Sequence, residues 1–397
     1  MTDTVIIGGR VILDGILLDG GSVHLRGSKI AAVSMGPLHI PGATVIDAAG
    51  RYVSPGFIDL HVHGALQRSF SDATIESFDI LTRFYARYGI TALQATPSAL
   101  PLAGMRRVLD AYRKWRDGKY RGGSEILGVH LEGPYFSQEQ RGAQPPRYIR
   151  APGSDDLALL RDNLDIITEI SLAPEVPGNV ALTRELSSHG VVVAAAHSAA
   201  KEYEILPAIE AGLSHVTHIY SGSSMVIREG PYRVPGLVEV GLTHPALTVE
   251  MIADGKHLPP TLMRLITRAR GTDRTCIVSD AISAAGRPEG ERFESEGAEV
   301  VIQDGVAMMA DMTCFAGSIT PLGRMVYNLM TLIDMPLLEA VKMATVVPAR
   351  VLHIENRKGR LAPGLDADVV IFDEQINVDK TIVSGQVVYD RSRQREE

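Results

Sequence analysis

The sequence contains only two cysteines, Cys276 and Cys314, so a disulfide framework cannot be what stabilises the fold. It has no run approaching about 18 uncharged apolar residues, and we therefore expect no membrane span. The first residues, MTDTVIIGGRVILDG, lack the basic segment and long apolar core of a secretory signal. The basic residues are scattered and the formal net charge is −8, which does not favour nucleic-acid binding. These absences predict a cytoplasmic protein with neither a membrane nor a nucleic acid as partner.

The two ends of the chain differ in pattern from its middle. Residues 4–53 alternate apolar and polar residues between glycine-rich turns, and the tail repeats this pattern in GRLAPGLDADVVIFD and DKTIVSGQVVYD. Such alternation predicts short antiparallel strands. We therefore predict a composite small β-sandwich domain made of residues 1–53 and 355–397, with a larger domain of residues 54–354 between them.

In the middle, short apolar runs alternate with amphipathic stretches such as 75–88 and 260–270, and helical segments at 319–333 and 336–347 follow the last run. Uniformly apolar strands joined by helices predict an α/β fold with a parallel sheet, and eight such units predict a (β/α)₈ TIM barrel. An open doubly wound sheet is the alternative. It would more often carry a glycine-rich phosphate loop near its first strand, and GGRVILDG matches no dinucleotide-binding fingerprint. The eight runs are 53–60, 90–96, 126–131, 166–173, 191–196, 214–219, 247–253 and 275–280.

Histidines and carboxylates follow six of these predicted strands, at the carboxyl ends that carry the chemistry of a barrel. His61 and His63 should project side by side, because residues i and i+2 of a strand share a face. A surface His-Val-His is the alternative for that pair alone, but the joint placement at successive strand ends favours a metal site. The strand-end residues are His61, His63, Glu132, His197, His218, His257 and Asp280.

Imidazoles and carboxylates suit divalent ions such as Zn²⁺. Four histidines and a carboxylate are more than one tetrahedral ion with an open position needs, so we predict two ions that share a carboxylate. His61, His63 and Glu132 would hold one ion, and Glu132, His197 and His218 the other.

The predicted site suits hydrolysis. A hydroxide held by the metals, with its pKa lowered towards ~7, would be the nucleophile. Asp280 would take the proton from that water and deliver it to a leaving nitrogen. The metals would stabilise the oxyanion, with His257 a candidate helper.

The segments PGFIDLHVHG, GVHLEGPY, AAAHS, VTHIY, IADGKH and VSDAI resemble the amidohydrolase superfamily and, within it, the N-acetylglucosamine-6-phosphate deacetylases. The resemblance covers nearly the whole chain. Its specific part is HLEGP, where a glutamate on the third strand takes the place of the carbamylated lysine that most two-metal members carry on the fourth. It implies metal-dependent hydrolysis of an N-acetyl amino sugar phosphate to the amine and acetate, by a homodimer. It also implies that Glu132, His197 and His218 bind metal, that Asp280 is the catalytic acid/base, that His257 contacts substrate, and that His61 and His63 belong to members with both metals.

The substrate side departs from that family. Ser221 and Gly222 stand where the family has the Asn-Ala segment that contacts phosphate, and Gln144 stands where it has a sugar-contacting histidine. The family's phosphate-binding arginine corresponds to Arg233 in YRVPG, with Arg228 as a rival.

Three hypotheses stay open. The first is a deacetylase of an N-acetylhexosamine 6-phosphate. The second keeps this chemistry for another N-acyl amine, an unphosphorylated amino sugar or a cyclic amide. The third is an inactive relative that serves as a binding protein, which the intact ligand set disfavours.

Overall fold

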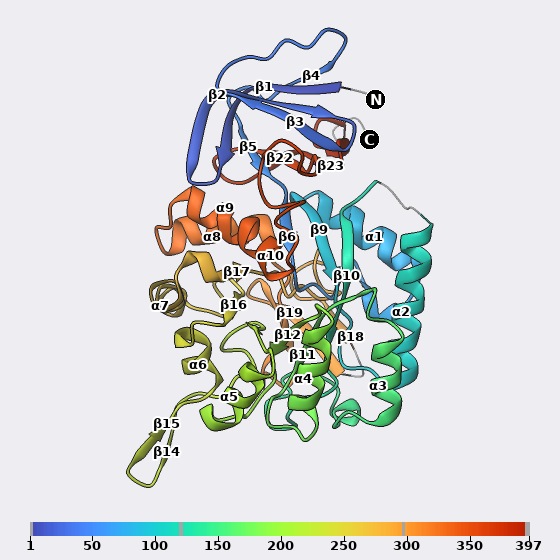
Figure 1. The fold of residues 1–397 in the computed structure, drawn as a ribbon, viewed down its shortest axis with the longest axis vertical. Helices are drawn as coiled ribbons and strands as arrows, with labels where there is room; N and C mark the ends of the chain where they lie inside the picture. The colour runs from blue at the N-terminus through green and yellow to red at the C-terminus, as the bar shows by residue number, and fades with distance from the viewer. Residues whose placement is uncertain (1–2, 119–121, 296–297, 394–397) are drawn as a thin grey trace.

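A computed structural model describes residues 3–118, 122–295 and 298–393 of the chain. It places a small β domain, formed by both ends of the chain, against one end of a larger α/β domain (Figure 1). Residues 1–2 and 394–397 of the predicted small domain lie outside the described residues. Within the described part of the chain, no helix has the length and apolarity that crossing a membrane requires.

The larger domain is built on eight parallel strands, and each of the eight predicted runs overlaps one of them. The segments that follow the first and last strands bring the ring together: Asp280 N–H donates to His61 O (2.9 Å), and His63 N–H donates to Ala281 O (2.8 Å). The predicted barrel is therefore confirmed. In neighbour order its strands are β17 (Thr275–Ile277), β16 (Thr248–Met251), β13 (His215–Val216), β12 (Val192–Ala195), β11 (Ile167–Leu172), β10 (Glu125–Glu132), β9 (Ile90–Ala95) and β6 (Phe57–Asp59).

Helices surround this barrel and bury their apolar stripes against it (Figure 1). In the first helix, Thr74 caps the amino end by accepting from Ser77 N–H (3.1 Å), and Phe78, Leu81 and Tyr85 share the buried face. The helices are α1 (Ile75–Ala86), α2 (Leu102–Asp117), α3 (Ser154–Arg161), α4 (Asn179–Ser188), α5 (Glu202–Glu210), α6 (Leu237–Thr243), α7 (Pro260–Arg270), α8 (Leu322–Leu332), α9 (Leu337–Ala344) and α10 (Val346–Val351), with 3₁₀ turns η1 (Phe70–Asp72), η2 (Pro146–Tyr148) and η3 (Thr272–Arg274).

Strands from both ends of the chain join in one hydrogen-bonded sheet, as the composite domain requires. The sheet has its own apolar cluster, to which Val11, Val23 and Ile371 contribute. Its order is β24 (Gln386–Asp390), β23 (Val378–Val383), β22 (Val369–Phe372), β5 (Tyr52–Pro55), β1 (Asp3–Leu13), β2 (Ile16–Arg26) and β3 (Lys29–Ser34), with β4 (Thr44–Asp47) paired to β1.

The predicted first barrel strand, 53–60, is in fact divided between the two domains. Its first part lies in β5, which pairs with β1 and β22 of the terminal sheet, and only β6 enters the barrel. Gly56 stands at the break, where a Cβ would lie 2.1 Å from Thr91 Oγ1. The Pro55-Gly56 pair inside the run is a turn signal at this break, and the predicted boundary at residue 53 falls inside β5.

A four-stranded antiparallel sheet between the last barrel strand and α8 was not predicted. Its sequence signal is the Asp304-Gly305 turn between two apolar segments, a common hairpin sequence. The strands are β18 (Arg292–Ser295), β19 (Ala298–Gln303), β20 (Val306–Met309) and β21 (Phe315–Gly317). Two small hairpins complete the described fold: β7 (Gly64–Ala65) with β8 (Arg68–Ser69), and β14 (Ile227–Glu229) with β15 (Tyr232–Val234), which projects from the body in Figure 1.

Candidate metal centre

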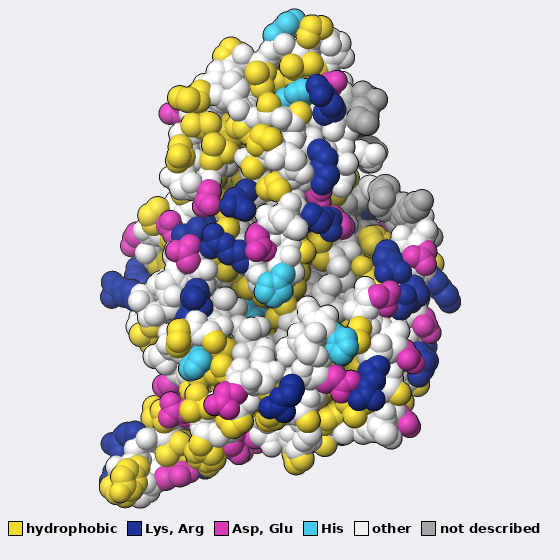
Figure 2. Space-filling model, in the orientation of Figure 1, with side chains coloured by type: hydrophobic (Ala, Val, Ile, Leu, Met, Phe, Trp, Pro, Cys, Tyr) yellow, Lys and Arg dark blue, Asp and Glu magenta, His cyan; other side chains and the backbone are white. Residues whose placement is uncertain are grey.

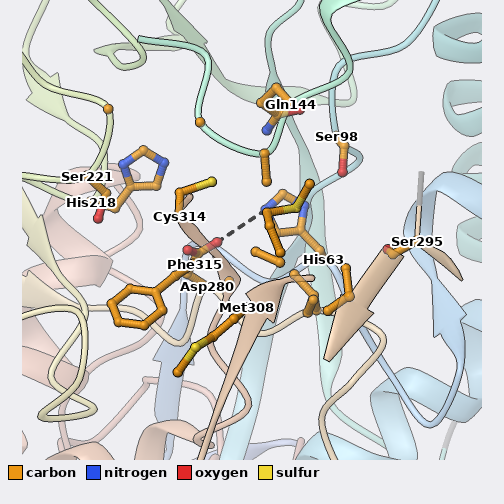
Figure 3. A pocket seen from close by; sticks show the side chains of 18 of the residues that line it. His63, Ser98, Gln144, His218, Ser221, Asp280, Ser295, Met308, Cys314 and Phe315 are labelled. Atoms are coloured by element: carbon orange, nitrogen blue, oxygen red, sulfur yellow. Dashed lines mark ion pairs between the residues drawn. The ribbon is translucent and has the colours of Figure 1, made fainter. Parts of the chain in front are cut away.

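The carboxyl ends of the barrel strands open into a cavity of about 590 Å³. Figure 3 shows His63, His218 and Asp280 facing into it, and Met308 and Phe315 of the additional sheet also line it. Six of the seven predicted strand-end residues line this cavity, and the seventh, His61, lies fully buried next to them. The chain thus brings the whole predicted set to one place.

His61 and His63 lie side by side as predicted, with their Nε2 atoms 3.1 Å apart. The outer ring nitrogen of each faces an oxygen: His61 Nδ1 lies 3.2 Å from Glu250 Oε2, and His63 Nδ1 lies 2.9 Å from Thr96 O. Because carboxylate and carbonyl oxygens only accept, these Nδ1 atoms carry the proton. Both Nε2 atoms therefore turn lone pairs towards the cavity.

Glu132, at the end of β10, is the centre of the cluster. Its Oε1 lies 2.9 Å from His218 Nε2 and 3.1 Å from His197 Nε2. The same carboxylate lies 3.6 Å from His61 Nε2 through Oε1 and 3.4 Å from His63 Nε2 through Oε2. One carboxylate therefore faces both predicted histidine pairs, which is the position of a shared ligand.

The composition of this cluster fits divalent cations. His197 Nδ1 faces Gln140 O at 2.9 Å, so its Nε2, which lies 3.1 Å from Glu132 Oε1, is the ring nitrogen that a metal ion would bind. Several lone pairs and two carboxylates, Glu132 and Asp280, thus converge on a small buried volume. Among the described residues that line the cavity, none is a lysine or arginine. Electron-pair donors gathered without a fixed cation are what a metal site requires.

The electrostatics follow from this crowding. Burial disfavours the charged form of His61, but Glu132 and Glu250 outweigh it and raise the pKa of His61 well above its ordinary value. Burial likewise opposes the charge of His63, yet Asp280 and Glu132 raise its pKa. Burial alone would raise the pKa of Glu132, but the surrounding histidines hold it well below its ordinary value. In the ion-free cluster protons take the place that divalent ions would fill, so ions and protons compete for it.

Three of the strand-end residues have left-handed backbones, which are unusual for residues other than glycine. The φ angles are +46° at His197, +28° at His218 and +47° at Asp280. Each such residue costs on the order of 1–3 kcal/mol, and such strain gathers at functional sites. The fold therefore holds these side chains in place at an energetic cost.

Asp280 and His257 occupy neighbouring parts of the same wall. Asp280 Oδ1 lies 3.3 Å from His63 Nε2 and 3.5 Å from His61 Nε2, and His63, with His61, lowers its pKa against the effect of burial. His257 Nδ1 lies 2.7 Å from Asp254 Oδ2 and its ring packs on Phe315 at 4.8 Å. Asp254 raises the pKa of His257 against the effect of burial. Asp280 could also act as a metal ligand, since it groups with His61 and His63.

The predicted substrate residues Gln144, Ser221 and Gly222 also line the cavity. Gln144 donates its amide nitrogen to Glu132 Oε2 and accepts from Ala99 N–H (2.8 Å), so it holds the central carboxylate as well as facing the cavity. At Gly222, where φ is +55°, a Cβ would lie 2.6 Å from His197 Nδ1. Glycine is needed here because any side chain would displace His197.

Arg228 and Arg233 are not brought to this cavity. They lie opposite each other on the exposed hairpin β14–β15, and neither is among the cavity-lining residues of its own chain. The expectation that one of them contacts substrate is therefore not met by a single chain.

The additional sheet supplies cavity residues that were not predicted. They include Met308, Met312 and Phe315, which give one wall an apolar character (Figure 3). The Asp304-Gly305 turn between two apolar segments could have revealed the hairpin from the sequence. Only the folded chain shows that the hairpin lies over the mouth of the barrel.

Comparisons with known proteins agree with this geometry. The Amidohydrolase family matches residues 52–388. The chain is 36% identical to an N-acetylglucosamine-6-phosphate deacetylase of Vibrio furnissii, over 85% of this chain and 82% of that protein. It is 32% identical to an N-acetylgalactosamine-6-phosphate deacetylase of Escherichia coli O157:H7, over 95% and 97%. The crystal structure of N-acetylglucosamine-6-phosphate deacetylase from Pasteurella multocida superposes with a TM-score of 0.90 at 28% identity, covering 97% of this chain and 99% of that one.

Proposed function

The chain belongs to the amidohydrolase family, and we propose that it hydrolyses the acetamide of an N-acetylhexosamine 6-phosphate to the amino sugar phosphate and acetate. The observation that carries this proposal is the convergence of four histidines with Glu132 and Asp280 at the mouth of the barrel. The named activities of relatives at 36% and 32% identity supply the substrate class.

We propose two divalent ions per chain, with zinc as the expected metal. His61 and His63 would hold one, His197 and His218 the other, and Glu132 would serve both. A bound divalent ion polarises an amide carbonyl and makes water a better nucleophile near neutral pH. Imidazole and carboxylate donors are the ligands that zinc hydrolases use.

Asp280 is the proposed proton carrier. Its carboxylate accepts a proton from the water that adds to the amide carbon, and it returns the proton to the nitrogen as the carbon–nitrogen bond breaks. The depressed pKa of Asp280, caused by His63 and His61 against the effect of burial, keeps it ready to accept that proton. His257, fixed by Asp254, faces the cavity as a hydrogen-bond donor for the carbonyl oxygen or the sugar.

A phosphate group needs positive charge, and the described cavity lining has neither lysine nor arginine. We therefore propose a homodimer in which hairpin β14–β15 brings Arg228 or Arg233 to the cavity of the other chain. The hairpin is suited to an interface because its exposed side chains include Val226, Ile227 and Tyr232, the last 74% exposed. Figure 2 shows hydrophobic and basic side chains together on this projection at the lower left. Gly222 would add its backbone N–H group.

The test is acetate release by the zinc-loaded protein. N-acetylglucosamine 6-phosphate, N-acetylgalactosamine 6-phosphate and the unphosphorylated sugars are compared at equal concentration. We expect turnover of the phosphorylated sugars only. No release from any of them by a chain shown to hold two ions would refute the proposed substrate and favour the alternative, the same chemistry on another amide.

The dimer is tested by mixing two inactive variants. Asp280→Asn lacks the proton carrier, and the double variant Arg228→Ala/Arg233→Ala lacks the hairpin arginines. If the arginines act across the interface, subunit exchange creates one intact site per mixed dimer and restores activity. If mixed dimers of confirmed composition recover no activity, the arginines act within their own chain or have no role in the site.

The cytoplasmic location remains a prediction.

A further inference from the structure

Glu250 is a fully buried carboxylate on β16, below the cavity, and it contacts two of the proposed ligand segments at once. Its Oε2 lies 3.2 Å from His61 Nδ1 and accepts from the backbone N–H of His218 (3.0 Å). Its exposed fraction is 0%, and it is not one of the residues that line the cavity. It therefore cannot touch substrate.

The other carboxylate oxygen of Glu250 faces His215. Oε1 lies 3.5 Å from His215 Nε2, and His215 Nδ1 lies 2.6 Å from Thr248 Oγ1. The hydrogen bonds that hold Glu250 are those of Oε2 to the two ligand segments. A buried carboxylate bonded in this way orients the ring that it contacts.

We propose that Glu250 is a positioning residue for the metal centre: it fixes His61 with its proton on Nδ1 and its Nε2 lone pair aimed at the ion shared with His63. A carboxylate behind a metal-bound imidazole sets the ring orientation and raises the basicity of the ligand nitrogen. Because Glu250 bonds the ring of His61 but only the backbone of His218, it supports the His61–His63 ion more than the His197–His218 ion.

The alternative use of Glu250 as a ligand for a third ion is less favoured. Glu250, Glu169 and His215 do lie close enough to surround an ion. However, Oε2 of Glu250 already serves His61 and His218. Burial and the neighbouring Glu250 also raise the pKa of Glu169 well above its ordinary value, which disfavours its charged form. The occupied oxygen of Glu250 is the geometric reason that this group is less suited to a cation.

This inference rests on the proposed two-ion centre, and the test separates the two. Glu250→Gln keeps the shape and one accepting oxygen but removes the charge. Glu169→Gln is the matched control: it is equally buried, and it replaces an acid whose partner is Gln94, which can donate to Glu169 Oε2 (2.9 Å). Each protein is loaded with Zn²⁺ or Co²⁺ and dialysed against graded chelator, and bound metal is measured by mass spectrometry together with the Co²⁺ absorption spectrum.

We expect Glu250→Gln to weaken one of two ions by about 10- to 100-fold and to leave the other, while Glu169→Gln retains both. A general packing defect would instead weaken both ions together, and that result would overturn the proposal. So would two ions of unchanged affinity in Glu250→Gln. A wild-type chain that binds no metal would refute the proposed function itself.

If Glu250→Gln does not fold, the zinc-loaded wild type still decides the matter. Nitrogen-15 spectra of labelled histidines should show His61 protonated at Nδ1 and bound through Nε2. An unprotonated Nδ1 on His61 would overturn the proposal.

Discussion

Strand β10 begins with Glu125 and ends with Glu132, and each glutamate lies in a group of side chains whose ligand atoms are close enough together to hold a metal ion. At the amino end, Glu125 meets Asp366 and Asp368 where the small domain contacts the barrel. At the carboxyl end, Glu132 groups with His61 and His218, and Asp280 groups with His61 and His63. By spacing alone the two clusters look similar.

They differ in their positive charges. The junction cluster contains its own cations: Lys358 Nζ lies 2.7 Å from Glu125 Oε2 and also pairs with Asp368, while Lys29 and Arg357 pair with Asp366. Glu132 and Asp280 pair with histidines only, in the part of the chain that the structure describes. The carboxylates of the junction cluster are already paired with lysine and arginine and so can hold the two domains together. The carboxylates at the carboxyl end are paired only with imidazoles and remain available for an ion. This division matches the roles of the two faces of a barrel.

The largest effect is expected from Asp280→Asn at the carboxyl end. Loss of the proton carrier should lower kcat by about 10²- to 10⁴-fold, while bound metal stays near two ions per chain. Acetate release and metal analysis on the same sample check this. A variant that instead loses metal would show that Asp280 is chiefly a ligand.

The matching change at the amino end is Lys358→Met. Its side chain is 1% exposed, so removing the cation leaves Glu125, Asp366 and Asp368 facing one another without their central partner. We expect a loss of about 3–5 kcal/mol in the free energy of unfolding, with kcat of the folded enzyme unchanged. Urea unfolding and acetate release measure the two effects, and a variant of wild-type stability would mean that the junction cluster contributes nothing.

The pH dependence of the junction has a definite sign. Burial lowers the pKa of Lys358, but Asp368 and Glu125 outweigh it and raise the pKa above its ordinary value of 10.5. The stabilisation is therefore complete below pH 10.5 and is lost as the pH rises through the raised value. Lys358→Met should lack this alkaline loss, which unfolding curves above pH 10 would test.

A smaller effect is expected from Gly222→Ala. The new Cβ would meet His197 Nδ1 at 2.6 Å, so we expect about a 10- to 100-fold loss of kcat with weaker binding of one ion. Gly190→Ala is the control, since its φ of +82° is also left-handed but nothing lies within 4 Å. It should lose on the order of 1 kcal/mol of stability and no activity. Equal activity losses in both variants would mean that backbone strain, and not His197, is responsible.

The sequence was sufficient to predict the barrel and its strand-end residues, because hydrophobic runs and their polar ends are local patterns. His61, His63 and Glu132 were found in this way. The Pro55-Gly56 pair was a local sign that the first run is divided, but the close approach of Gly56 to the distant Thr91 could be seen only in the folded chain. Likewise, its position at the carboxyl end of a strand singled out Glu132, but no local pattern could show that Glu125 pairs with a lysine more than two hundred residues away in the chain. Glu250 was not predicted because it lies within an apolar run and its partners lie on other segments of the chain.

The last prediction concerns how protons affect the carboxyl-end cluster. Burial opposes the charge of both His61 and His63. Glu132 and Glu250 nevertheless raise the pKa of His61, and Asp280 and Glu132 raise the pKa of His63. In the ion-free protein these histidines therefore hold protons at higher pH than free histidine does. An arriving ion must displace those protons, so metal affinity should fall as the pH falls, by about tenfold per pH unit for each proton displaced. Zinc titrations of the apo-protein in buffers of different ionisation enthalpy would count the protons released. Zinc uptake without proton release would mean that these histidines are already neutral in the ion-free protein. Their lone pairs would then face one another with neither a proton nor an ion between them. The junction cluster, with Lys358 in place, should neither take up zinc nor release protons in the same titration.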